Sequence, residues 1–447
     1  MPKVVLIGAG GVIFAQNFIK DILIREALRD SEIALMDIDA GRLGNAVSFA
    51  KKIGEKLGVS PKISSSTDLR TSLKRADYVI TIFRVGTLEH QRMEYEIPRK
   101  YGVDQVVGDS MGPGGMFRGL RTLKALFEVL DKMEEICPDA YLFNYVNPMS
   151  LNTIALNRRA RSVKTIGLCH SVPHTASQLA GYIGVDKNKV RYQVAGINHQ
   201  AFFLKFEADG HDAYPQLRDA MSKPEIYKKD KVRFELFRHF GYFPTESSGH
   251  GSEYIPYIRK RKDLIEKFCS LEPDSGKAYS MNTGTSGAAL KACVELQKNN
   301  EKEITELLSG KKEFDINPSD EYAVQIINAI ETNAALSANL NVINHGLIDT
   351  LPPESCVEVP CLVDGAGITP CKIENYPEQL AGLNRGMINF QMMGAEGAVS
   401  FDKRKIFQAI ALDPLTAAVC SLDEIEDMTN ELFASLRDQI DPKFFQK

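Results

Sequence analysis

The chain has 447 residues, of which 44% are hydrophobic and 25% charged; this is typical of a globular protein, and the length predicts about two to four domains. The formal net charge of −4 argues against nucleic acid or an anionic membrane as the main partner. Apolar runs stay below the roughly 18 residues that a transmembrane helix needs, and the first residues predict a strand instead of a signal peptide.

The first predicted strand leads directly into a glycine-rich turn at residues 8–11, and a second strand ends at Asp37. In a dinucleotide site, glycines let backbone N–H groups approach a pyrophosphate, and an acidic residue accepts hydrogen bonds from a ribose diol. The usual third glycine is replaced by Ile13, and Asp37 lies further on than the roughly 20 residues expected. An ordinary turn between strand and helix is the alternative, but the flanking pattern favours NAD binding.

Strand-like and helix-like stretches alternate through the first two hundred residues. The predicted strands are residues 4–7, 33–36, 78–83, 141–145 and 165–168, and the predicted helices are residues 17–28, 43–57 and 120–136. Such alternation predicts an α/β fold, a Rossmann-like doubly wound parallel sheet. Ligands of such sheets bind beyond the carboxyl ends of the strands, so the loops that follow the strands are the candidate site.

The pattern changes after residue 195. Strands are predicted at residues 191–196 and 201–207, a solvated segment at 223–231, an exposed helix at 298–312, and helices at 321–336, 405–412 and 422–436. We predict a NAD-binding Rossmann-like domain at residues 1–195. An interwoven α+β domain for substrate, metal and oligomerisation is predicted at residues 196–447.

Two polar dipeptides, Cys169-His170 and Asn198-His199, each follow a predicted strand. If these strands were adjacent and parallel, both dipeptides would lie at one edge of the sheet. A thiolate and an imidazole suit a divalent metal that also takes substrate oxygens, although a Cys–His pair alone is more often inert. Catalysis by a Ser-His-Asp triad is disfavoured because no G-x-S-x-G turn surrounds Ser171 or Ser247.

Three other segments have both a structural and a functional interpretation. Residues 109–115 form a glycine-rich turn that could cap a helix or hold substrate hydroxyls. Arg92 lies on a predicted helix, where a solvated face is the default interpretation. Residues 246–254 combine acids, hydroxyls, a histidine and a tyrosine, which favours an active-site lid over a structural loop.

These motifs together resemble glycoside hydrolase family 4, the NAD-dependent glycosidases. They are GAGGVIF with LMDID, DSMGPGG, NYVNPM, GLCHSV, AGINH, ESSGHGSEY and CVEVPCLVD, in this order along the chain. The resemblance is nearest to the α-galactosidase (melibiase) branch. It implies oxidation of the sugar at carbon 3 by NAD, metal-assisted elimination of the aglycone, addition of water and return of the hydride.

The resemblance also implies a role for individual residues. Manganese would be bound by Cys169 and His199, and NAD by Gly8, Gly10, Gly11, Asp37 and Asp39. The catalytic residues would be Tyr254, as the base at carbon 2, and Asp109 or its competitor His170, as the proton donor to the leaving group. Sugar hydroxyls would be held by Arg92, Asn147 and Asn198.

The leading interpretation is therefore an α-galactosidase that acts on melibiose-like, small-molecule α-glycosides. An α-glucosidase, an α-galacturonidase or a glucuronidase would use the same chemistry. An NAD-dependent hydroxy-acid dehydrogenase and a non-catalytic NAD-binding protein are alternatives of other classes. We expect no nucleic-acid or membrane partner, a homodimer or homotetramer as in relatives, and a cytoplasmic protein whose eight cysteines are reduced.

Overall fold

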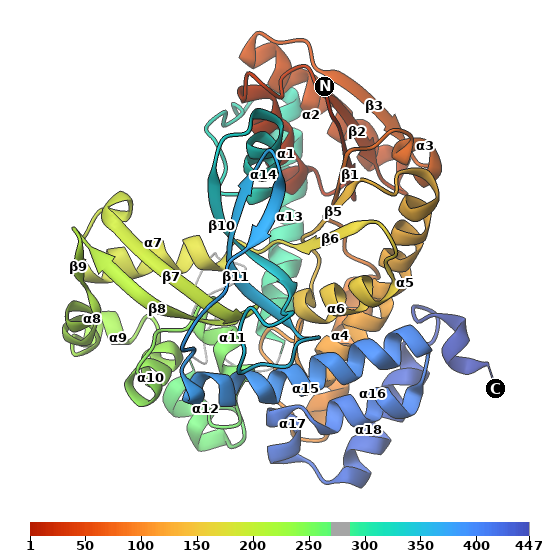
Figure 1. The fold of residues 1–447 in the computed structure, drawn as a ribbon. Helices are drawn as coiled ribbons and strands as arrows, with labels where there is room; N and C mark the ends of the chain where they lie inside the picture. The colour runs from red at the N-terminus through yellow and green to blue at the C-terminus, as the bar shows by residue number, and fades with distance from the viewer. Residues whose placement is uncertain (270–286, 447) are drawn as a thin grey trace.

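The computed structural model describes residues 1–269 and 287–446, and the twelve strands in this part of the chain form one sheet. Its parallel half has the order β3-β2-β1-β4-β5-β6 (Figure 1). These strands are β1 (Lys3–Ile7), β2 (Glu32–Met36), β3 (Lys62–Ser66), β4 (Tyr78–Thr81), β5 (Tyr141–Asn144) and β6 (Lys164–Gly167). The predicted Rossmann-like α/β fold is confirmed. The sequence did not predict β3, because KISSS is polar and lies at the edge of the sheet.

The sheet continues with antiparallel strands in the order β10-β11-β7-β8-β9, and β12 pairs with β11. They are β7 (Val190–Ile197), β8 (Gln200–Ala208), β9 (His211–Asp212), β10 (Leu336–Ile343), β11 (Cys356–Asp364) and β12 (Gly367–Pro370). A single pair, Asn341 with Gly167, joins β10 to β6, and a single pair, Glu358 with Gly196, joins β11 to β7. The two halves of the chain are therefore interwoven, and β7 spans residue 195, where we placed the domain boundary.

Helices of the first half connect and cover the parallel strands. They are α1 (Val12–Ile24), α2 (Ala40–Leu57), α3 (Leu69–Leu73), α4 (Leu88–Lys100), α5 (Gly112–Ile136), α6 (Met149–Arg159) and α7 (Ser171–Ile183). In α5, Leu120, Leu123, Leu126, Phe127 and Leu130 are buried, and this spacing of three or four residues explains why the helix forms with one face in the core.

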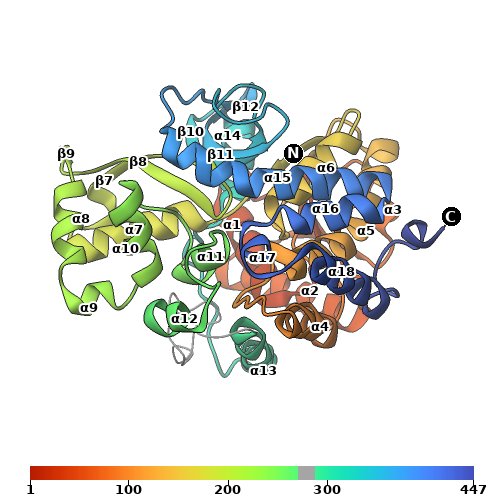
Figure 2. The same cartoon turned by 90° about the horizontal axis from the view of Figure 1, so that it is seen from below.

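Helices of the second half form two groups along the chain, one before and one after residues 270–286, and Figures 1 and 2 show where each helix lies. The first group is α8 (Tyr214–Met221), α9 (Pro224–Tyr227), α10 (Lys231–Phe240), α11 (Ser248–Glu253) and α12 (Lys262–Phe268). The second is α13 (Ala288–Ser309), α14 (Tyr322–Thr332), α15 (Glu378–Ser400), α16 (Lys403–Ala411), α17 (Pro414–Val419) and α18 (Leu422–Ser435). A separate apolar cluster packs α7, α8 and α10 against β7 and β8. None of the described helices is long and apolar enough to span a bilayer.

Several predicted boundaries were wrong. Helix α5 begins at Gly112 and not near Leu120, because Pro113 suits a first helical turn, so half of the predicted glycine-rich turn is helical. Helix α1 begins at Val12, directly after the glycines. The helix predicted at 321–336 ends at Thr332, shortly before β10 begins. The segment 223–231 is mostly exposed, as predicted for a solvated segment, and it contains the short helix α9.

Candidate active site

The glycine-rich turn between β1 and α1 lies at the carboxyl edge of the parallel strands and is closed against Asp37. The Asp37 carboxylate accepts hydrogen bonds from Gly10 N at 2.8 Å and from Asp39 N at 3.0 Å. A Cβ on Gly10 would lie 2.5 Å from Asp37 Oδ2, so this position requires glycine. The turn fits the dinucleotide site that the sequence predicts, and Asp37 also organises its backbone.

The second acidic residue of this region, Asp39, has a local role. It is the N-cap of α2, where its side chain accepts a hydrogen bond from Arg42 N at 3.0 Å, and this bond holds the pKa of the carboxyl below its ordinary value. Gly8 has a φ of +94°, a conformation that glycine adopts readily.

Cys169 and His199 lie together, as predicted, but for a different reason. Cys169 Sγ is 3.5 Å from His199 Nε2. Strands β6 and β7, which precede these residues, are neither adjacent nor parallel, since the β10–β11 hairpin separates them and each pairing across it is antiparallel. The prediction of adjacent parallel strands was therefore wrong, while the predicted proximity is confirmed.

His199 lies in the tight turn between β7 and β8 and has a φ of +63°, which is uncommon for a residue with a side chain. Its second ring nitrogen, Nδ1, faces the hydroxyl oxygens of Ser110 and Tyr254, each at 3.5 Å. The ring is 4% exposed, and burial together with the charge of His250 lowers its pKa. A neutral imidazole with Nε2 directed at a thiol is the form that ligates metals.

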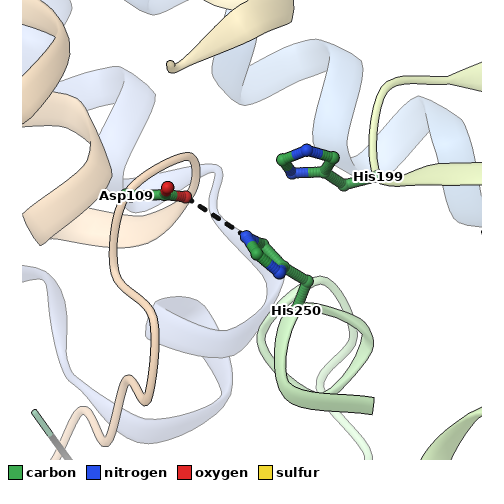
Figure 3. A group of neighbouring side chains, drawn as sticks. All are labelled: Asp109, His199 and His250. Carbon is green, nitrogen blue, oxygen red and sulfur yellow. Dashed lines mark hydrogen bonds and ion pairs between the residues drawn. The ribbon is translucent and has the colours of Figure 1, made fainter. Parts of the chain in front are cut away.

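Asp109, from the loop before α5, is a buried carboxylate with three hydrogen-bond partners, of which Figure 3 shows His250. Ser110 Oγ donates to Oδ1 at 2.7 Å, Asn147 Nδ2 donates to Oδ2 at 3.0 Å, and His250 Nε2 lies 3.3 Å from Oδ1. Burial alone would raise the pKa of Asp109, but the hydrogen bond to His250 and its charge hold it well below its ordinary value.

His250, on α11, connects two carboxylates. Its Nδ1 lies 3.3 Å from Glu246 Oε1, while Nε2 contacts Asp109. Burial lowers the pKa of His250, but the two carboxylates raise it by more. The pKa of His250 therefore lies well above its ordinary value. Glu246 in turn lies 3.9 Å from His199 Nε2. A continuous series of polar contacts, buried except at the partly exposed Glu246, therefore joins Asp109 to the Cys169–His199 pair.

Sequence reasoning did not single out Glu246 and His250 individually. The only signal was the density of acids, hydroxyls and a histidine in residues 246–254, which we interpreted as a lid. In the structure most of this segment is the buried helix α11. Its Glu253 accepts hydrogen bonds from Val107 N and Gly108 N, which fixes the loop that carries Asp109.

The remaining predicted residues have different environments. His170 is half-exposed with Nδ1 3.6 Å from Glu321; burial opposes its protonation, but the contact with Glu321 raises its pKa to about 9. Tyr254 is 2% exposed, and burial raises its pKa well above the ordinary value. Arg92 lies on the solvated face of α4, paired with Glu89 and Glu96, and the structure does not bring it to the cluster.

Several buried polar atoms at this edge of the sheet have no hydrogen-bond partner among the described residues. They are Nδ2 of Asn198, Oγ of Ser171, both side-chain atoms of Asn341 and both carboxylate oxygens of Glu358. Burial raises the pKa of Glu358 well above its ordinary value. Orphaned polar atoms are rare in folded interiors, so their concentration beside Cys169 and His199 indicates that this region holds a polar ligand.

Comparisons with known proteins match almost the whole chain. Models of the families described as "Family 4 glycosyl hydrolase" and "Family 4 glycosyl hydrolase C-terminal domain" match residues 3–185 and 194–416. An alpha-galactosidase of Bacillus subtilis is 40% identical over 97% of this chain and 98% of its own. An alpha-galactosidase of Rhizobium meliloti is 34% identical over 96% and 87%. A 6-phospho-alpha-glucosidase from gut microorganisms, solved with NAD and Mn²⁺, is 19% identical with a TM-score of 0.81 over 98% of this chain and 99% of its own.

Proposed function

The chain belongs to glycosyl hydrolase family 4, and we propose that it is an α-galactosidase that requires NAD and a divalent metal, with manganese as the expected ion. The observation that carries this proposal is the Cys169–His199 pair at 3.5 Å, next to a buried series of carboxylate and imidazole groups. Both alpha-galactosidase relatives, at 40% and 34% identity, support galactosides as substrates.

The residues fit both cofactors of this proposal. The turn at residues 8–11 has no space for a side chain at Gly10 and precedes the N-terminus of α1, which suits a pyrophosphate. Cys169 and His199 would hold the metal. When bound, NAD supplies reversible hydride transfer at carbon 3 of the sugar, and the divalent cation supplies polarisation of sugar oxygens.

The proposal assigns Asp109 to sugar binding. Both of its oxygens accept hydrogen bonds from protein donors, so it is an ionised acceptor suited to a sugar hydroxyl and not a proton donor. Asn147, which contacts it, and Asn198, whose amide nitrogen has no partner among the described residues, would bind further hydroxyls. The buried carboxylate of Asp109 and the partly buried carboxylate of Glu246 favour a neutral sugar over a phosphorylated or uronic one, since like charges repel.

Proton transfer falls to two other residues in this proposal. Tyr254 would remove the proton at carbon 2; its hydroxyl lies 3.5 Å from His199 Nδ1, and a nearby cation would offset the effect of burial on its pKa. His170, which is half-exposed and follows Cys169, would donate the proton to the departing oxygen with Glu321 holding its ring.

The experiment is release of p-nitrophenol from the α-galactoside, the α-glucoside and the α-galacturonide, each with and without NAD⁺, Mn²⁺ and a thiol reductant. We expect the α-galactoside to be cleaved fastest, and only when both cofactors are present. Fastest cleavage of the α-glucoside or galacturonide would change the substrate but keep the mechanism. Net NADH formation on a hydroxy acid, with no glycoside cleaved, would contradict the proposal.

Two features of organisation remain predictions. We propose the division into residues 1–195 and 196–447 as domains, and a homodimer or homotetramer in solution. Sedimentation velocity of the NAD-bound protein measures the second directly, and a monomer would contradict it.

A further inference from the structure

We propose that Glu246 is a third protein ligand of the metal, beside Cys169 and His199. This inference depends on the proposed function, since it concerns the ion that the proposed reaction requires. Ligand atoms of the three side chains all lie within 4.8 Å of one another.

The distance between His199 and Glu246 fits a shared ion better than a direct hydrogen bond. His199 Nε2 is 3.5 Å from Cys169 Sγ and 3.9 Å from Glu246 Oε2. A nitrogen–oxygen hydrogen bond is about 2.7–3.2 Å long, so the 3.9 Å contact is too long for one. Ligands that bind one ion at about 2.0–2.3 Å lie about 3–4 Å apart, because they occupy neighbouring coordination positions.

A second group of potential ligands, Asp109, His199 and His250 (Figure 3), shares His199 with the first. It is the weaker candidate because its members already bind one another. Both ring nitrogens of His250 contact carboxylates, and Asp109 accepts hydrogen bonds from Ser110 and Asn147. The Nδ1 face of His199 is likewise directed at hydroxyls. This group therefore orients the ligands, and the Nε2 face of His199 is left for the ion.

The two carboxylate oxygens of Glu246 have different neighbours, one suited to holding the carboxylate in place and the other to binding the ion. Oε1 lies 3.3 Å from His250 Nδ1, which fixes the carboxylate, while Oε2 is the oxygen nearer to His199 Nε2. A metal-bound carboxylate is commonly held in this way by a hydrogen bond to its other oxygen.

The fold holds Glu246 in this position in an unfavourable backbone conformation. Its φ is +71°, an uncommon value for a residue with a side chain. Glu246 N donates to Thr175 Oγ1 at 3.1 Å, and Glu246 O accepts a hydrogen bond from Arg233 Nη1 at 2.6 Å. Arg233 is fully buried and also binds Asp230 and Gln178. The side chain that holds the backbone of Glu246 is therefore itself held in place.

A carboxylate also adds chemical selectivity. Thiolate and imidazole favour zinc and copper, whereas manganese prefers oxygen ligands. Adding Glu246 shifts the ligand set toward manganese and still leaves coordination positions for sugar oxygens.

The test is a titration of Mn²⁺ into the NAD⁺-loaded, reduced protein, with free Mn²⁺ measured by electron paramagnetic resonance. We expect Glu246→Gln to raise the dissociation constant by about 100-fold, since even indirect ligand contacts are worth about 10–100-fold. Glu235→Gln removes another largely buried carboxylate, on α10, and should leave the constant unchanged. His250→Gln should raise it less than Glu246→Gln, because it removes only a support of the carboxylate.

Two results would overturn the inference. The first is an unchanged dissociation constant for Mn²⁺ in Glu246→Gln. The second is an equal loss of Mn²⁺ affinity in Glu246→Gln and His250→Gln, which would make Glu246 only a counter-ion of His250. If Glu246→Gln does not fold, Glu246→Asp keeps the charge but shortens its reach, and an unchanged constant there would equally contradict the inference. Failure of the wild-type protein to bind Mn²⁺ at all would overturn the proposed function as well, which separates the two failures.

Discussion

The turn at residues 8–11 allows two substitutions in one loop whose effects should differ strongly. Gly10→Ala would place a Cβ 2.5 Å from Asp37 Oδ2, 2.7 Å from its Cγ and 2.9 Å from Arg42 Cβ. The Asp37 carboxylate cannot simply rotate away, because it holds Gly10 N at 2.8 Å and Asp39 N at 3.0 Å. A hydrogen bond to a charged group is worth about 1.5–3 kcal/mol, and overpacking costs about 1–3 kcal/mol.

We therefore expect Gly10→Ala to weaken NAD⁺ binding by about 10- to 100-fold, which corresponds to about 1.4–2.8 kcal/mol. Urea unfolding should also show a lower free energy of unfolding, by about 1–3 kcal/mol. Isothermal titration calorimetry with NAD⁺ measures the first quantity on the folded variant.

Gly11→Ala is the matched control. Its Cβ would meet nothing nearer than Gly8 O at 3.4 Å, and its φ of −73° suits any residue. Because Gly11 is the N-cap of α1, we expect a loss of stability of only about 0.5–1 kcal/mol. Equal losses of NAD⁺ affinity and stability in the two variants would refute the argument that Asp37 and Gly10 together shape the turn.

Three further changes test other parts of the account. Cys169→Ser should abolish Mn²⁺ binding but leave NAD⁺ affinity unchanged, and calorimetry with each cofactor would contradict this if both affinities fell together. Glu94→Gln should lower the free energy of unfolding by about 3–5 kcal/mol, because it leaves the Arg121 guanidinium buried without its carboxylate; a loss in urea unfolding no larger than that of the exposed Glu135→Gln would argue against it. Burial raises the pKa of Asp413 from 3.8 to about 6. The folded state therefore binds this proton more tightly than the unfolded state, and Asp413 alone should lower the free energy of unfolding by about 2–3 kcal/mol as pH rises from 4 to 7. Asp413→Asn should not show this loss, and parallel pH profiles of the two proteins would contradict the assignment.

Most of the parallel half of the sheet was predictable because its central strands are apolar runs, whereas the polar edge strand β3 was not. VVLI, IALM and YVIT have no polar face, as expected for strands covered on both sides. The insertion of β10 and β11 between β6 and β7 was not predictable, because it depends on pairings such as Asn341 with Gly167 that join residues far apart in the sequence.

The candidate site was predictable to a similar degree. Cys169 and His199 could be placed together because both follow strands at a ligand-binding edge, although the strand arrangement assumed for them was wrong. Glu246, His250 and Glu358 could not be assigned, since their relevance comes from burial and from partners in distant segments. For Arg92 the error runs in the other direction. The family resemblance assigned it to the sugar site, whereas in the structure it lies on α4 and pairs with Glu89 and Glu96.

In the proposed reaction a galactoside is cleaved by oxidation and elimination and not by direct displacement. The most direct measurement is hydrolysis of an α-galactoside in D₂O with NAD⁺ and Mn²⁺, followed by nuclear magnetic resonance of the released galactose. Removal of the proton at carbon 2 and its later replacement from solvent predict deuterium at that carbon. Galactose that retains its original hydrogen at carbon 2 would contradict the account.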